Sequence, residues 1–330
     1  MSTLMGALRR RALAPSLHAV SLAGRGFPVT PSAVTAQLDR VPQSVVCGFE
    51  WGVDTVEVGE LARRLDFIEP ELRGFGYEGA AMAWVILDAM RAGRTNRARA
   101  LLLGPGQPHI FLTYIGIGFA LARLPRGLWK KVVPDLTGSP YHPTMSWLAV
   151  DGYGFDLAYF HPRRWVDEQR VPKPYPWQDA PEYFPRAVDQ GIGRALWFMH
   201  GADVDSVGAA VARFPGHRQA DLWSGVGLAA TFAGGATDAD LTRLRAGAGD
   251  RWTELALGAV FAAKARSYAG FVPAHTEAAT AALGAGTVAE AVALADGTED
   301  AAVSGARQPA YELWRQRIRA ELAAAKARLR

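Results

Sequence analysis

Six stretches of the chain share one pattern, in which small residues interrupt an apolar segment that is typical of a buried helix. The stretches are YEGAAMAWV from Tyr77, YIGIGFALA from Tyr114, VDGYGFDLA from Val150, DQGIGRALW from Asp189, WSGVGLAAT from Trp223 and ALGAVFAAK from Ala256. Their first small residues align as Gly79, Gly116, Gly152, Gly191, Gly225 and Gly258, with offsets of 37, 36, 39, 34 and 33 residues. A weaker copy lies at Gly48. A period near 36 predicts a repeated structural unit.

Each repeat is predicted to hold two helices. A proline, which the first turn of a helix tolerates, precedes most of the glycines by six to ten residues: Pro42, Pro70, Pro108, Pro143, Pro185 and Pro215. The glycine-bearing helix, called the inner helix here, is therefore expected to begin near each proline. Second helices are predicted over Thr95–Leu103, Arg126–Val133, Asp203–Phe214, Asp238–Arg245 and Pro273–Leu283, with N-caps at Asp203 and Thr237. The pattern predicts an all-α solenoid of about seven antiparallel hairpins, which loosely resembles tetratricopeptide repeats.

The paired glycines Gly116 and Gly118 admit two interpretations. A phosphate-binding loop would need a preceding strand and an acidic residue about 20 positions later, and the sister copies do not look like such turns. In a helix, Gly116 and Ala120 share one face, whereas Gly118 and Ala122 share the roughly opposite one. We therefore expect a packing motif that lets one inner helix approach both of its neighbours closely.

Three segments are expected within one structural domain: a basic arm and cap over residues 1–41, the repeats over 42–308, and a capping helix over 309–330. The capping helix carries an apolar stripe with arginines elsewhere: Tyr311, Leu313, Trp314, Ile318 and Leu322. The proline-rich segment 171–185 is either a surface connection or a lid that brings aromatic residues to a pocket: Tyr175, Trp177, Tyr183 and Phe184.

Composition narrows the classes of function. The formal charge of +4 is small for 330 residues, and many basic residues lie in Arg9–Arg11 and Lys326–Arg330, so a nucleic-acid partner is not expected. The longest apolar run has 13 residues, Ile110 to Ala122, which is too short for a transmembrane helix. The single Cys47 excludes an intrachain disulfide and a cysteine-based metal site. Without a secretory signal pattern, we expect a cytoplasmic protein that uses neither metal nor cofactor.

Comparison between repeats singles out two charged residues. Three positions after the aligned glycine, Arg194 stands in an otherwise apolar column, and one position further Asp156 stands among alanines. A charge is costly where sister repeats bury a small apolar group, unless it is paired or functional. The two residues either pair within the fold or serve as catalytic groups.

The position before the glycine is polar in four copies: Glu78, Asp151, Gln190 and Ser224, with Glu50 nearby in the weak copy and Asp189 and Trp223 adjacent. If this column faces the concave side of the solenoid, it lines a groove with carboxylates; if it faces the outer helices, it is solvated or capping. Asp156, Arg194, Glu78 and Asp189 are the candidate catalytic groups.

The histidines are not spaced for a metal site. His161 follows Asp156 by five residues, and His217 and Arg218 precede Trp223 at the start of another inner helix. An aspartate with a nearby histidine and arginine could transfer protons, although each is equally compatible with a groove or surface role. No Gly-x-Ser-x-Gly motif supports a hydrolase triad.

The stretches YEGAAMA, DGYGFDLAYF, DQGIGRALWF and above all DLWSGVGLAATFAGG resemble a bacterial family of unknown function found in enediyne polyketide gene clusters. The resemblance implies an accessory role and assigns no catalytic residue. One hypothesis is that the solenoid holds an apolar, polyene-like intermediate and catalyses a cofactor-independent cyclisation or rearrangement, within aromatic walls from Trp84, Phe119, Tyr153, Phe155, Trp197 and Trp223. The alternative is a scaffold that binds a polyketide synthase, a carrier protein or a partner enzyme.

Overall fold

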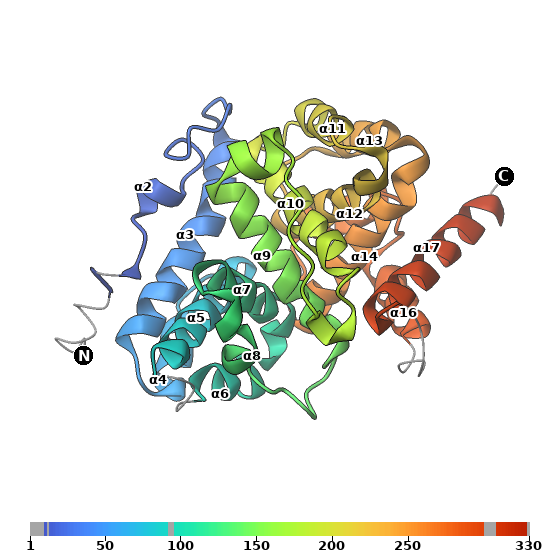
Figure 1. Ribbon diagram of the computed structural model, residues 1–330. Helices are drawn as coiled ribbons and strands as arrows, with labels where there is room; N and C mark the ends of the chain where they lie inside the picture. The colour runs from blue at the N-terminus through green and yellow to red at the C-terminus, as the bar shows by residue number, and fades with distance from the viewer. Residues whose placement is uncertain (1–9, 12, 92–95, 300–307, 329–330) are drawn as a thin grey trace. The chain divides into compact units, whose positions relative to one another are not determined.

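The structure is a computed structural model that describes residues 10–11, 13–91, 96–299 and 308–328. Over these residues the chain is helical and contains no β-strand (Figure 1). It divides into two compact units, one of residues 1–27 and 39–156 and the other of residues 28–38 and 157–330. The dividing points fall inside helices α3 (Ala33–Asp54) and α9 (Trp147–Phe160).

The first unit contains most of α3 and α9 and alternates long with short helices. Besides α2 (Leu17–Val20), its further helices are α4 (Val58–Leu65), α5 (Pro70–Met90), α6 (Arg97–Leu103), η1 (Gln107–His109), α7 (Ile110–Arg123), η2 (Arg126–Leu128), α8 (Trp129–Val132) and η3 (Thr144–Ser146). The inner helices α5 and α7 pack along each other, and the short helices α4 and α6 form an outer layer. Arg9 of the basic arm and Thr95, the expected start of a second helix, lie outside the described residues.

The second unit repeats the arrangement. Its helices are the π-helical turn η4 (Arg163–Asp167), η5 (Trp177–Asp179), α10 (Phe184–Met199), α11 (Val204–Ala212), α12 (Gly216–Ala233), α13 (Asp238–Gly247), η6 (Gly249–Arg251), α14 (Trp252–Tyr268), α15 (Ala274–Ala282), α16 (Val288–Thr298) and α17 (Ala310–Arg328). Inner helix α12 packs between α10 and α14, while α13 packs between α11 and α15 in the outer layer. These consecutive contacts confirm the predicted α-solenoid.

Paired glycines make the close contacts between inner helices. A Cβ atom at Gly116 would lie 2.0 Å from the carbonyl oxygen of Glu78 in α5, and one at Gly118 would lie 2.1 Å from that of Ala149 in α9. Gly225 and Gly227 in α12 are equally close to α10 and α14. The two glycines of a pair therefore face opposite neighbours in mid-helix, which confirms the packing interpretation.

Most helix starts agree with the sequence signals. Pro70 and Pro185 lie in the first turns of α5 and α10, and the Asp203 carboxylate accepts from Ser206 N at 2.8 Å to cap α11. The predicted start near Pro42 is wrong, because α3 begins at Ala33 and includes this proline. The start signal lies upstream, where the hydroxyls of Ser32 and Thr35 each accept from the other residue's backbone N–H.

Candidate functional site

In the first unit, three of the predicted site residues come together near the C-terminal ends of α7 and α9. The rings of Phe119 and Phe155 lie 5.6 Å apart, and both Tyr153 and Phe155 are half-buried. Asp156 follows Phe155 directly and is buried. We call Phe119, Phe155 and Asp156 the aromatic cluster.

The charge of Asp156 is matched inside this cluster. Arg123 Nη1, at the end of α7, donates to Asp156 Oδ2, and it also donates to the carbonyl oxygen of Phe119 at 2.8 Å. A cation is favourable at the C-terminus of a helix, where the backbone carbonyls carry partial negative charge. The sequence outlier Asp156 is thus an ion-paired residue beside an aromatic surface.

Tyr153, two residues before Phe155 in α9, belongs to a separate aromatic pair with Trp129, at a ring-centre distance of 5.1 Å. The guanidinium of Arg126 lies 5.3 Å from the ring centre of Trp129 and 5.9 Å from that of Tyr153, which is within the range of cation–π attraction. The aromatic cluster and this pair thus each have one arginine beside them, Arg123 and Arg126.

The other predicted residues of this unit lie mainly inside the helix packing. Glu78 in α5 and Asp151 in α9 are buried, and Glu50 in α3 is half-buried. Trp84 is buried in the core, where its Nε1–H donates to Gly52 O at 2.9 Å. This indole braces α5 against the end of α3.

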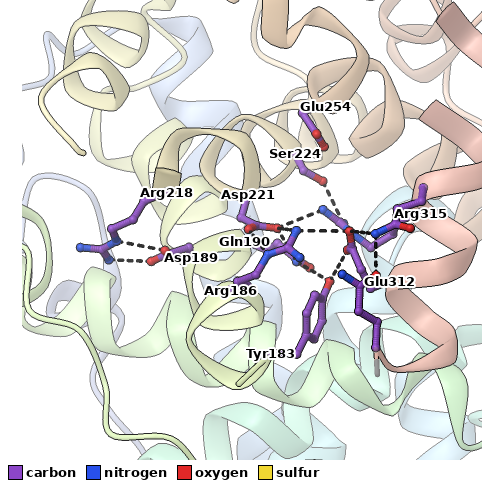
Figure 2. A network of polar contacts seen from close by, with 12 residues as sticks. Tyr183, Arg186, Asp189, Gln190, Arg218, Asp221, Ser224, Glu254, Glu312 and Arg315 are labelled. Atoms are coloured by element: carbon purple, nitrogen blue, oxygen red, sulfur yellow. Dashed lines mark hydrogen bonds and ion pairs between the residues drawn. The ribbon is translucent and has the colours of Figure 1, made fainter. Parts of the chain in front are cut away.

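In the second unit, the N-terminal half of α17 lies over the inner helices and makes a buried polar network with them (Figure 2). Its polar contacts reach one inner helix after another. Tyr311 OH donates to Gln190 Oε1 of α10 at 3.3 Å, Arg315 Nη1 to Ser224 Oγ of α12 at 3.1 Å, and Arg319 Nη1 to Glu254 Oε2 of α14 at 3.1 Å. Successive turns of α17 therefore contact successive inner helices.

Glu312 is the centre of this network. Its carboxylate accepts from Arg319 Nη2 at 2.9 Å, from Arg315 Nε at 3.2 Å and from Arg186 Nη2 at 3.2 Å. Tyr183 OH donates a further hydrogen bond at 2.9 Å. Burial alone would raise the pKa of Glu312, but the three arginines outweigh it and lower the pKa to about 2.

Asp221 of α12 is the second centre. It accepts from Arg186 Nε at 2.8 Å, from Gln190 Nε2 at 3.0 Å and from Arg315 Nη2 at 3.3 Å. The ion pairs of this network among the described residues join three carboxylates to three guanidinium groups, so its charges balance: Asp221, Glu254 and Glu312 against Arg186, Arg315 and Arg319.

Asp189 and Arg218 form a separate buried pair beside this network (Figure 2). Arg218 Nε donates to Asp189 Oδ2 at 3.0 Å, its Nη2 donates to Oδ1, and its Nη1 donates to Gln169 O at 2.8 Å. Burial raises the pKa of Asp189 to about 6, against the lowering effect of Arg218. The pair joins two predicted site residues.

The remaining candidates of this unit are spread through it. Arg194, Trp197 and Trp223 are buried in α10 and α12, and Trp197 Nε1–H donates to Gly234 O at 2.9 Å. His161 and His217 are exposed. In the proline-rich segment, Trp177, Tyr183 and Phe184 are buried and Tyr175 is half-buried.

The charged face of α17 was not predicted from the sequence. Its arginines were expected away from the buried stripe, but Glu312 and Arg315 are each only 1% exposed. A signal was present, because Glu312, Arg315 and Arg319 recur at spacings of three and four residues and so share one helix face. Apolar periodicity alone could not show that this face is buried.

The structure also bears on metal binding and on membrane insertion. Within the described ranges, no three histidine, cysteine, aspartate or glutamate side chains are grouped as a metal site would require. Every helix in the same ranges is too short or too polar to span a lipid bilayer.

Comparison with known proteins gives a family and no characterised relative. The model of a family described as protein of unknown function (DUF1702) matches residues 4–322. No curated protein and no solved structure matches the chain.

Proposed function

Since the chain belongs to the DUF1702 family of proteins of unknown function, we propose its role from the geometry: a non-catalytic helical-repeat scaffold. By the resemblance noted from its sequence, it would serve as a cytoplasmic accessory protein in enediyne-type polyketide biosynthesis. Its partners would be a polyketide synthase, a carrier protein or another enzyme of the pathway. It would need no cofactor.

The observation that carries this proposal is the pairing of both candidate catalytic aspartates within the fold. Asp156 is held by Arg123, and both oxygens of Asp189 accept from Arg218. A general base must be within reach of the proton that it removes, and an oxygen already held by a guanidinium is poorly placed for this. Stacked helical hairpins, in contrast, commonly present extended surfaces to protein partners.

Isosteric neutralisation tests the scaffold against the enzyme. We expect Asp156→Asn and Asp189→Asn to leave product formation in the producing strain unchanged, because neither removes a surface that a partner would contact. Loss of general acid–base catalysis would instead lower turnover about 10²–10⁴-fold. Thermal unfolding of each purified variant shows whether it is folded.

Since Asp189→Asn leaves Arg218 without its carboxylate, the double variant Asp189→Asn/Arg218→Gln serves as its matched control. Product formation that collapses in a folded variant, single or double, would contradict the scaffold. Recovery of both folding and product in the double variant would assign a structural role to the pair.

The aromatic cluster favours a second candidate function, the binding of an apolar polyene-like intermediate. Phe119 and Phe155 offer adjacent ring faces, and Phe155 is half-buried, so part of this surface is accessible. Phe155→Ala should weaken binding of the fluorescent polyene cis-parinaric acid, whereas Phe271→Ala, at an exposed phenylalanine of the second unit, should not. Equal affinities of the two variants would remove this candidate.

A further inference from the structure

The C-terminal ends of two inner helices of the first unit, α5 and α7, lie at one edge. Gly74 approaches Leu112, and four residues further along each helix Glu78 approaches Gly116, so α5 and α7 run parallel. Their C-terminal ends are therefore on the same side. Arg99 Nε of α6 donates to Asp135 O beyond α8 at 2.8 Å, so α6 and the segment just beyond α8 also lie side by side.

This part of the chain is strongly basic. Residues 89–134 contain no aspartate or glutamate and eight lysine or arginine residues, in a protein whose formal charge is only +4. Arg91, Lys130 and Lys131 are exposed, and none of them forms an ion pair within the described part of the chain. The edge therefore presents three exposed cations without an ion pair among the described residues, and the exposed carboxylate of Asp135 lies just beyond it.

Apolar side chains are exposed at the ends of α5 and η2. Met90 is 64% exposed directly before Arg91, and Leu128 is 37% exposed two residues before Lys130. Each of these two helix ends thus combines one exposed apolar residue with neighbouring exposed cations. We call Met90, Arg91, Leu128, Lys130 and Lys131 the basic edge.

The connections of the second unit differ. Phe271, between α14 and α15, is exposed, but the nearby cations Lys264 and Arg266 are buried and bonded to Asp296 and to Phe232 O. The exposed Arg213 and Arg243 of that unit lie beside carboxylates. Exposed apolar groups and unpaired cations therefore coincide on the basic edge and not at these positions.

We propose that the basic edge binds the surface of an anionic lipid bilayer. Cations near such a surface are attracted by its negative potential, and apolar side chains between them can enter the boundary between head groups and acyl chains. An acidic protein would also attract the cations, but a specific protein interface needs a contiguous patch of about 800 Å² on each partner, whereas Met90 and Leu128 are two separate apolar side chains among cations. The two apolar residues therefore favour a membrane over an acidic protein.

Vesicle co-sedimentation of the full chain tests this proposal. We expect binding to phosphatidylcholine vesicles that contain 30% phosphatidylglycerol, much weaker binding to pure phosphatidylcholine, and release at high salt, because exposed charges are screened. The variant Arg91→Gln/Lys130→Gln/Lys131→Gln should bind about 100-fold more weakly, at roughly fivefold for each cation near the surface.

The matched control is Arg163→Gln/Arg213→Gln/Arg243→Gln, which removes the same charge from exposed positions of the second unit and should bind as the unmodified protein does. Met90→Ser/Leu128→Ser keeps every cation and should still lose most of the binding. Equal loss in the two charge variants, full binding by Met90→Ser/Leu128→Ser, or no binding to phosphatidylglycerol at low salt would each overturn the proposal. Circular dichroism and thermal unfolding confirm that the variants are folded.

Discussion

A single methyl group is enough to test the contacts between inner helices. The Cβ atom of Gly225→Ala would lie 1.9 Å from Gln190 O, a backbone atom that cannot rotate away. Overpacking of this kind costs about 1–3 kcal/mol and occasionally more. We therefore expect Gly225→Ala to lower the free energy of unfolding by about 3 kcal/mol, measured by urea denaturation.

Gly247→Ala is its control, because Gly247 ends the outer helix α13 and nothing lies within 4 Å of its added Cβ. Alanine is the better helix former by up to about 1 kcal/mol, so this variant should be as stable as the parent or slightly more so. If the two substitutions had equal effects, close approach of the helices would not explain the paired glycines.

Glu312 makes the stability depend on pH. Its pKa is about 2 in the folded protein, below the ordinary value of 4.5. A carboxylate with a lowered pKa stabilises the fold above its unfolded pKa, and this contribution is lost as the pH falls through the folded pKa. We expect Glu312→Gln to be less stable than the parent at pH 7 by about 3 kcal/mol, at 1.36 kcal/mol for each pKa unit.

The difference between parent and Glu312→Gln should shrink as the pH falls from about 4.5 to 2, as followed by denaturant titrations at each pH. Taking this difference cancels the opposite contribution of Asp189, whose raised pKa makes stability fall as the pH rises from about 4 to 6. Glu182→Gln, at an exposed residue, is the control. A gap that stays constant with pH would contradict the assigned role of Glu312.

Comparison between the repeats identified an unusual charged residue but not the residue with which it pairs. Alignment of the repeats singled out Asp156, and the structure shows that it is buried and ion-paired. Its partner Arg123 gave no signal, because an arginine at the end of a helix is usually solvated. Pairing between distant segments depends on the way helices pack, and one sequence does not record that directly.

At the scale of the element, α17 is held by charge as well as by apolar burial. Arg315→Met should destabilise the protein by about 3–5 kcal/mol, because it removes one partner of a buried ion network and leaves carboxylate charge uncompensated. Chemical denaturation measures the loss. Arg328→Met, at an exposed arginine in the last turn of the same helix, should have little effect.

The double variant Glu312→Gln/Arg315→Met removes one charge of each sign. Its cost should be smaller than the sum of the two single costs, because the charges that remain are balanced again. Additive costs would show that the two side chains act independently and would contradict the network.

Helix boundaries were predictable where a cap or a proline marks them. Thr237 caps α13 in the predicted place, and Pro309 immediately precedes α17. The start of α3 was mistaken because Pro42 is a visible marker, whereas the pairing of Ser32 with Thr35 is less distinctive in the sequence. Periodicity therefore gave the fold, and side-chain hydrogen bonds decided the details.

At the scale of the whole molecule, the effect of a local defect on stability should spread from one repeat to the next. Each repeat of a solenoid contacts mainly its neighbours, so a local defect is felt most by the adjoining repeats. Gly258→Ala would press on Ser224 O of α12. Amide hydrogen exchange should accelerate most in α12 and α14 and less in α10.

The Gly247→Ala variant again provides the baseline for exchange. Equal acceleration over α10, α12 and α14 would show that the second unit unfolds as one cooperative block. That result would contradict the nearest-neighbour description of the repeats.

The stepwise contacts of α17 set a limit on how this array can change in length. Tyr311, Arg315 and Arg319, spaced by four residues, reach three consecutive inner helices in order. An extra hairpin inserted between α10 and α14 would shift the later helices by one place and separate each of these side chains from its acceptor. The C-terminal helix thus tolerates substitutions along the repeats but fixes the number of inner helices that lie against it.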